Sequence, residues 1–94
     1  MNHYWSVESV ALPTRKAALA WRTWHHVGRL PGNEISRFKL FVRQDNTGKW
    51  RVVRKIYEHE LNDPLLGNDK AIAQYRKHLQ DVTREAHRVI KGKL

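Results

Sequence analysis

A chain of 94 residues, 40% of them hydrophobic, has room for one domain with a modest core and little room for a deep catalytic cleft. The net charge is +9 and there is no cysteine, which excludes disulfides, thiolate zinc sites and cysteine nucleophiles. We therefore expect one folded domain over residues 1–94 that is not an enzyme and uses no cofactor or metal.

The first segment, residues 1–12, fits either a short strand or an irregular arm. A helix is predicted over residues 14–27, because Thr14 is a suitable N-cap and apolar residues follow at helical spacing. We expect Trp21 and Trp24, on its apolar side, to lie in the core together with Trp50.

Residues 35–57 form the clearest local pattern, a β-hairpin. Two β-rich runs flank residues 45–48 (DNTG), a sequence that favours a tight turn with Gly48 in the left-handed conformation. Alternation along the strands puts apolar side chains on one face and cations on the other. The predicted core face has Phe38, Leu40, Val42, Trp50, Val52 and Ile56, with Arg54 as its one charge. The opposite face has Arg37, Lys39, Phe41, Arg43, Lys49, Arg51, Val53, Lys55 and Tyr57.

The last predicted helix covers residues 69–91, with Asn68 or Asp69 as its cap and Gly92 after its end. One side carries an apolar band: Ile72, Tyr75, Leu79, Val82, Ala86 and Ile90. The order of elements predicts an α+β fold. In it an antiparallel β-hairpin, with or without a third, N-terminal strand, packs against two helices in the order (β)αββα.

The other side of this helix predicts a cationic stripe, because seven residues make almost two helical turns. Such a stripe would follow a phosphate backbone. It consists of Lys70, Lys77, Arg84 and Lys91, and Arg76, Arg88 and His87 would widen it. The alternative is a solvated helix face on which Asp81 and Glu85 pair with neighbouring cations.

The basic face of the hairpin is the second candidate for binding nucleic acid. Aromatic residues among cations suit single strands, whose bases stack on rings, and a two-stranded basic ribbon could also enter a major groove. The candidates are Arg37, Lys39, Phe41, Arg43, Arg51, Lys55 and Tyr57. In the alternative, Phe41, Val53 and Tyr57 are buried under the second helix or in a homodimer.

Two resemblances point in the same direction. Gly48-Lys49-Trp50-Arg51-Val52, Leu66-Gly67, Ala71 and Tyr75 together resemble the small sheet-plus-helix DNA-binding domains of the integrase arm-binding type, which lay a three-stranded sheet in the major groove. The helix–strands–helix order is also similar to a double-stranded-RNA-binding domain, although the paired lysines at that family's helix start are missing. Both imply nucleic-acid binding, and we assign the chain to neither family.

The basic excess runs through the whole chain rather than a terminal tail, and such a field attracts polyanions. The leading hypothesis is a non-enzymatic accessory protein that binds DNA or RNA, of the kind carried by bacteria, phages or mobile elements. The alternative is a small modulator or inhibitor that docks on an acidic patch of a host enzyme, such as a nucleic-acid-processing one. In that alternative, Tyr4 and Trp5 would be exposed and, with Phe41 and Tyr57, would serve as partner anchors. For Trp5 two other roles stay open: stacking on a base, or pinning the N-terminal segment to the domain.

The sequence also bears on where the protein works. No apolar run approaches the ~18 residues of a membrane span, and the N-terminus lacks the pattern of a secretion signal. The absence of cysteine favours a reducing compartment. We expect a cytoplasmic protein without a membrane partner.

Overall fold

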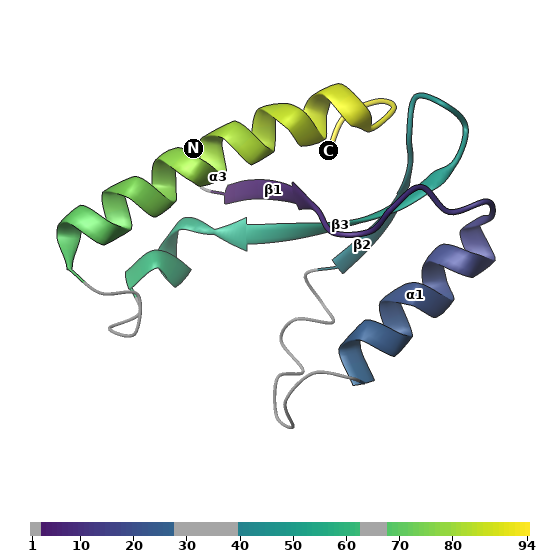
Figure 1. The fold of residues 1–94 in the computed structure, drawn as a ribbon, viewed down its shortest axis with the longest axis horizontal. Helices are drawn as coiled ribbons and strands as arrows, with labels where there is room; N and C mark the ends of the chain where they lie inside the picture. The colour runs from purple at the N-terminus through teal and green to yellow at the C-terminus, as the bar shows by residue number, and fades with distance from the viewer. Residues whose placement is uncertain (1–2, 28–39, 63–67) are drawn as a thin grey trace.

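The computed structural model describes residues 3–27, 40–62 and 68–94, and Figure 1 shows how their elements are arranged. In chain order these are β1 (His3–Val7), α1 (Arg15–Val27), β2 (Leu40–Gln44), β3 (Trp50–Tyr57), the 3-10 helix η1 (Glu58–Asn62) and α3 (Asp69–Val89). The predicted α+β class is confirmed, and the N-terminal segment is a strand, which completes the order βαββα. None of the helices in these ranges is long and apolar enough to cross a membrane.

The three strands form one antiparallel sheet in the order β1-β3-β2, so β3 is the central strand. On one side of β3, His3 of β1 lies opposite Tyr57; on the other side, Phe41 of β2 lies opposite Val53. This register confirms the alternation predicted for the described part of the hairpin. One face carries Leu40, Val42, Trp50, Val52, Arg54 and Ile56, and the other carries Phe41, Arg43, Arg51, Val53, Lys55 and Tyr57.

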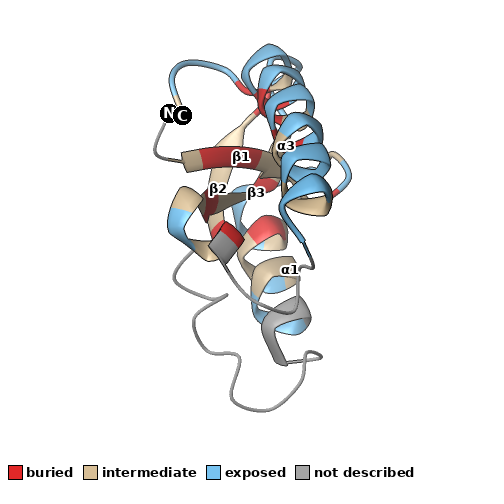
Figure 2. Ribbon diagram, turned by 90° about the vertical axis from the view of Figure 1, so that its left-hand side faces the viewer, coloured by how far each residue is buried: buried red, intermediate tan, exposed pale blue. Residues whose placement is uncertain are grey.

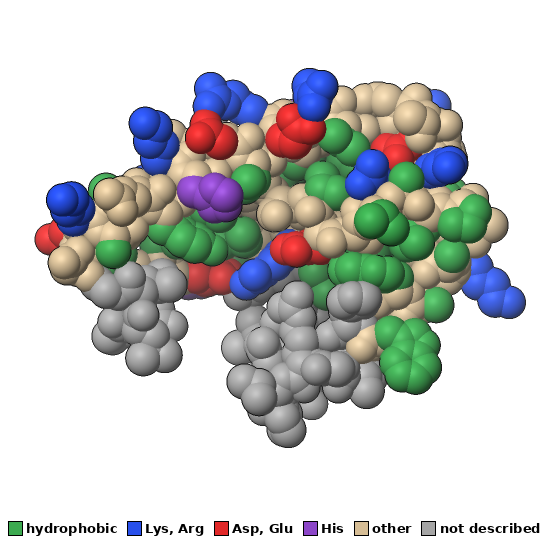
Figure 3. Space-filling model, viewed as in Figure 1, with side chains coloured by type: hydrophobic (Ala, Val, Ile, Leu, Met, Phe, Trp, Pro, Cys, Tyr) green, Lys and Arg blue, Asp and Glu red, His purple; other side chains and the backbone are tan. Residues whose placement is uncertain are grey.

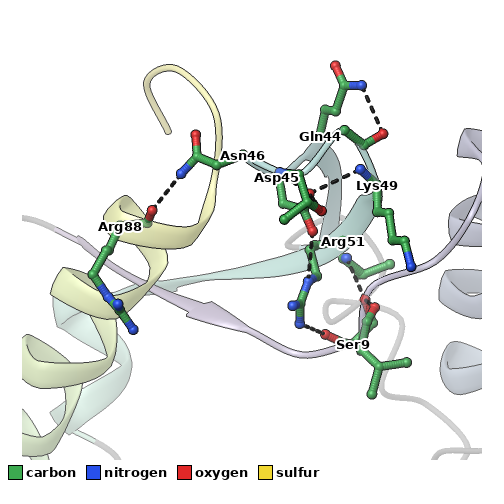
Figure 4. Close-up of polar contacts among 11 residues, drawn as sticks. Ser9, Gln44, Asp45, Asn46, Lys49, Arg51 and Arg88 are labelled. Atoms are coloured by element: carbon green, nitrogen blue, oxygen red, sulfur yellow. Dashed lines mark hydrogen bonds and ion pairs between the residues drawn. The ribbon is translucent and has the colours of Figure 1, made fainter.

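The hairpin turn closes around the buried carboxylate of Asp45. Its Oδ1 atom accepts hydrogen bonds from the Thr47 backbone N–H at 2.9 Å, the Thr47 hydroxyl at 2.6 Å and the Lys49 backbone N–H at 3.0 Å (Figure 4). The bond from the Thr47 hydroxyl contributes most to lowering the pKa of Asp45. Gly48 has a φ of 86°, the left-handed conformation that the turn sequence predicted.

The helix α1 begins and packs largely as its sequence predicts. The Thr14 hydroxyl oxygen accepts a hydrogen bond from the Ala17 backbone N–H at 3.0 Å, which confirms the N-cap. Ala18 is fully buried against Leu40 and Val52, so α1 covers the predicted core face of the hairpin.

The prediction that Trp24 lies in the core is wrong, because its side chain is 74% exposed. It follows the buried Ala18 by six residues, which places it about 240° around the helix axis and away from the sheet. Trp21 and Trp50 are half-buried and pack against the α1 core cluster.

The helix α3 lies along the edge of β1 that faces away from β3 (Figure 1). Tyr4 and Trp5 point to opposite faces of the sheet, yet both pack against α3 and are only 2% and 5% exposed. They are therefore not the exposed anchors of the second hypothesis, and Trp5 instead holds the N-terminal segment on the domain, the other role left open by the sequence. Of the predicted apolar band on α3, Leu79, Ala86 and Ile90 are buried and Tyr75 is 36% exposed.

The C-terminal end of α3 is fastened to the hairpin turn (Figure 4). The Asn46 backbone N–H donates to the Val89 carbonyl at 3.0 Å, and the Asn46 side-chain amide donates to the Arg88 carbonyl at 2.6 Å. These bonds satisfy carbonyls that the helix end would otherwise leave without a partner. The helix thus ends at Val89, and Lys91 lies beyond it rather than in its last turn.

Candidate nucleic-acid interface

One face of the sheet carries an uninterrupted series of cationic and aromatic side chains. It is formed by β1, β2 and β3 together with the first turn of η1, where His59 follows Tyr57 by two residues. We call it the cation–aromatic row, and in order of contact it comprises Arg43, Phe41, Trp5, Lys55, Tyr57 and His59.

The contacts along the row have the geometry of cation–π and aromatic pairs. The Arg43 guanidinium lies 5.3 Å from the centre of the Phe41 ring, and Phe41 meets Trp5 edge-on at 5.7 Å. The Lys55 ammonium lies 5.6 Å from the Trp5 ring and 5.1 Å from the Tyr57 ring. Such contacts hold cations on the surface of rings without the need for a carboxylate.

At its far end the row finishes in a stacked pair of rings. Tyr57 and His59 are 5.5 Å apart with an angle of 18° between their planes. His59 is exposed, whereas Tyr57 is half-buried. The Tyr57 backbone N–H donates to the Glu60 carboxylate at 3.2 Å, which holds η1 against the end of β3.

The middle of the row is covered by the end of α3. Ala86, Ile90 and Leu94 pack with Trp5, Val53 and Phe41 in one cluster. Val53 is completely buried, and Phe41 is half-buried. The burial that the sequence offered as the alternative is found for Val53, while Phe41 and Tyr57 are only half-buried. The end of α3 covers the centre of this face and leaves Arg43 and His59 at its two ends.

The cations of the row differ from Arg51 on the same face. Arg51 donates to the Asp45 carboxylate at 3.3 Å and to the Ser9 carbonyl at 3.0 Å (Figure 4), so it holds the turn and the chain after β1 together. Within the described ranges, neither Arg43 nor Lys55 forms an ion pair with a carboxylate. Their charges are therefore available to an anionic ligand.

His3 lies next to the row, with its ring edge-on to Trp5 at 5.8 Å. Burial lowers the pKa of His3, and the nearby positive charge of Lys55 lowers it further. The sequence alone did not identify His3 as part of this site. His3 joins it because it lies opposite Tyr57 in the register of β1 with β3, which local patterns do not give.

The cationic stripe predicted on α3 is partly neutralised by the helix's own acids. Arg84 pairs with Asp81 and Arg88 pairs with Glu85, each acid lying three residues before its arginine. The hydrogen bond from Arg88 lowers the pKa of Glu85. Lys70 and Lys77 are exposed, and no carboxylate pairs with them in the described part of the chain. Figure 3 shows basic and acidic side chains next to one another along the upper margin, over α3.

The two cationic sets face different directions. The stripe lies opposite the buried side of α3, and Figure 2 shows this outward side as exposed. The row, by contrast, belongs to a face of the sheet. Lys91 is held near the hairpin because its backbone N–H donates to the Gln44 carbonyl at 3.0 Å. The candidates Arg37 and Lys39 lie outside the described residues.

Tyr4 and Arg76 belong to a structural network rather than to a binding surface. The Tyr4 hydroxyl donates to Glu58 at 2.6 Å, and Arg76 donates to the other oxygen of that carboxylate through Nε at 2.8 Å. The hydrogen bond from Tyr4 is the largest cause of the lowered pKa of Glu58, followed by that from Arg76. This network joins β1, η1 and α3, so Arg76 does not widen the stripe.

Several edge groups of the sheet already have hydrogen-bond partners, which argues against binding by strand addition. On β2, the carbonyls of alternate residues accept hydrogen bonds from nearby groups: Leu40 from Arg22, Val42 from Arg43 and Gln44 from Lys91. On β1, the Trp5 backbone is bonded to Thr83 of α3. A ligand is therefore expected on a face of the sheet. In the described ranges no three histidine or acidic side chains are placed to hold a metal ion.

No protein-family model, curated protein or solved structure matches this chain. The likeness of short motifs to known DNA- and RNA-binding domains thus gains no support, and function must be inferred from the geometry of the site.

Proposed function

We propose that this protein is a non-enzymatic nucleic-acid-binding protein that contacts its ligand through the cation–aromatic row. Arg43 and Lys55 would meet phosphates, and the rings at the uncovered end of the row, Tyr57 and His59, would meet bases. The observation that carries the proposal is the position of Lys55, whose ammonium lies on the rings of Trp5 and Tyr57 with no carboxylate paired to it in the described chain.

The charge balance supports this choice over the two arginines of α3. Arg84 and Arg88 are paired with acids on their own helix, so a phosphate contact would have to compete with those pairs. Among the residues that the structure describes, Arg43 and Lys55 contact the polarisable faces of rings and, for Arg43, a backbone carbonyl, but no carboxylate. The net charge of +9 would speed the encounter with any polyanion.

The salt dependence of binding tests the proposal. Each lysine or arginine that contacts a phosphate releases counterions, so the logarithm of the affinity falls with the logarithm of salt concentration by roughly 0.7–0.9 per contact. We expect Lys55→Gln to weaken binding of a labelled oligonucleotide and to reduce that slope by about one contact. Lys16→Gln is the matched control, because Lys16 is exposed on α1, which packs on the face of the sheet opposite the row.

Two results would oppose the proposal. One is the absence of binding by the wild type at low salt. The other is an equal loss in the Lys55→Gln and Lys16→Gln variants, which would mean that net charge alone attracts the oligonucleotide.

The second candidate function is docking on an acidic protein surface, and one observation favours it. Trp24 is 74% exposed on α1, and tryptophan is enriched at the energetic centres of interfaces. The anchors first expected for this function, Tyr4 and Trp5, are buried. A pull-down with wild type and Trp24→Ala after nuclease treatment tests this candidate: one stoichiometric acidic protein retained only by wild type would support it.

A further inference from the structure

We infer that the end of the row at His59 is a base-stacking subsite and that the preferred ligand is single-stranded nucleic acid. This inference rests on the proposed function and specifies the substrate class. Three features support it. They are the exposed ring of His59 at the end of the row, the hydrogen bonds that hold the hairpin turn to the end of α3, and the packing of α3 over the middle of the row.

The exposed ring at the end of the row is the imidazole of His59. One of its faces lies on Tyr57, at 5.5 Å between ring centres and nearly parallel, while the residue as a whole is exposed. A base stacked on the outer face of His59 would extend an existing column of rings, and histidine is among the side chains on which unpaired bases stack. The ordering cost is low, because Tyr57 and η1 already hold the imidazole in place.

A cation lies next to this stack. Lys55 contacts the Tyr57 ring at 5.1 Å and is half-buried, so the phosphate of a nucleotide stacked on His59 would have a positive charge within a side chain's length. Stacking surfaces next to backbone cations are the combination that binds single strands with little sequence preference.

The attachment of the hairpin turn to the end of α3 disfavours a double-stranded ligand. A basic ribbon or sheet that reads a major groove has to insert its basic face into the groove. Here Asn46 ties the turn to the end of α3, and that end of the helix packs over the middle of the basic face. In a duplex the faces of the bases are also stacked on each other, so they could not reach His59.

The packing of α3 over the middle of the row determines how long a strand must be to contact both of its ends. The end of α3 and Leu94 pack over Trp5, Phe41 and Val53, which leaves Arg43 at one end of the face and Lys55 with His59 at the other. Arg43 lies opposite Arg51, and Lys55 follows four residues later on β3, about 13 Å away at ~3.3 Å per residue. A strand of a few nucleotides spans this distance.

The test compares a labelled single strand of about 12 nucleotides with the blunt duplex of the same sequence, by fluorescence anisotropy at low salt. Four proteins are needed: wild type, His59→Ala, His59→Phe and the control His78→Ala, which removes an exposed histidine from α3. Circular dichroism establishes that each variant is folded.

We expect wild type to bind the single strand at least about tenfold more tightly than the duplex. His59→Ala should weaken single-strand binding by about five- to tenfold, the lower end of the range for stacking of one base on a ring, without changing duplex binding. His59→Phe should restore binding, and His78→Ala should resemble wild type. Equal affinities for strand and duplex with His59→Ala indifferent would overturn the inference and leave the proposed function standing. Failure of wild type to bind either oligonucleotide would overturn both.

Discussion

The Thr83 hydroxyl of α3 accepts a hydrogen bond from the Trp5 backbone N–H of β1 at 2.9 Å, in a buried position. The same hydroxyl donates to the Leu79 carbonyl at 2.6 Å. A helix side chain thus takes the place that a neighbouring strand would otherwise occupy at this edge. Because Trp5 lies in the middle of the cation–aromatic row, this bond also fixes the row's position relative to α3.

We expect Thr83→Val to lower the free energy of unfolding by about 1–3 kcal/mol, because it leaves the buried Trp5 N–H without a partner while conserving side-chain volume. Thr83→Ser is the control, since it keeps the hydroxyl and loses only a methyl group. Urea denaturation of the three proteins measures the difference. Equal stability of the valine variant and wild type would mean that the bond does not hold the helix on the strand.

The network around Glu58 predicts a pH dependence of stability. The pKa of Glu58 is lowered in the folded protein, so the folded state binds fewer protons than the unfolded state as the solution becomes acidic. Its contribution is fully present above the ordinary value near 4.5 and is lost as the pH falls through the folded-state pKa. Glu58→Gln removes this contribution, so its stability should fall less steeply between pH 5 and pH 3 than that of wild type, as followed by urea denaturation at each pH.

The variant should keep some acid sensitivity, because the pKa values of Asp45 and Glu85 are lowered as well. Tyr4→Phe provides an independent check, since the Tyr4 hydroxyl is the main cause of the shift at Glu58. It should also flatten the profile. If the free energy of unfolding fell equally steeply with decreasing pH in wild type and in both variants, the role assigned to this network would be contradicted.

The hairpin was the part of the fold most accessible from the sequence, for a local reason. The turn residues Asp45 and Gly48 and the alternation of side chains both act over a few residues, and the structure confirms both. The position of α3 was not accessible in this way. Helical periodicity identifies which side of a helix is buried but not the element that covers it, so the exposure that the second hypothesis assumed for Tyr4 and Trp5 is wrong.

The candidate site was predicted only in part, because its contacts cross strands. Phe41, Arg43, Lys55 and Tyr57 were expected on one face from alternation alone. Trp5 and His3 join them only through the register of β1 with β3. The i,i+3 pairs on α3, in contrast, follow from local spacing, and the sequence had left this alternative open.

The ion pairs on α3 lead to a prediction about binding. Because Arg84 and Arg88 are already paired with Asp81 and Glu85, the double variant Arg84→Gln/Arg88→Gln should lower oligonucleotide affinity less than Arg43→Gln/Lys55→Gln, although both remove two positive charges. Anisotropy titrations at one salt concentration compare the two. A larger loss in the α3 variant would place the binding surface on the helix stripe.

The most direct test of the central claim is the map of backbone amide chemical-shift changes when the isotope-labelled protein is titrated with a short single strand. We expect the largest changes at Phe41, Lys55, Tyr57 and His59, with little change at Lys70, Lys77 and Arg84 on the outward side of α3. Changes concentrated on that outward side, or spread evenly over the whole surface, would contradict it.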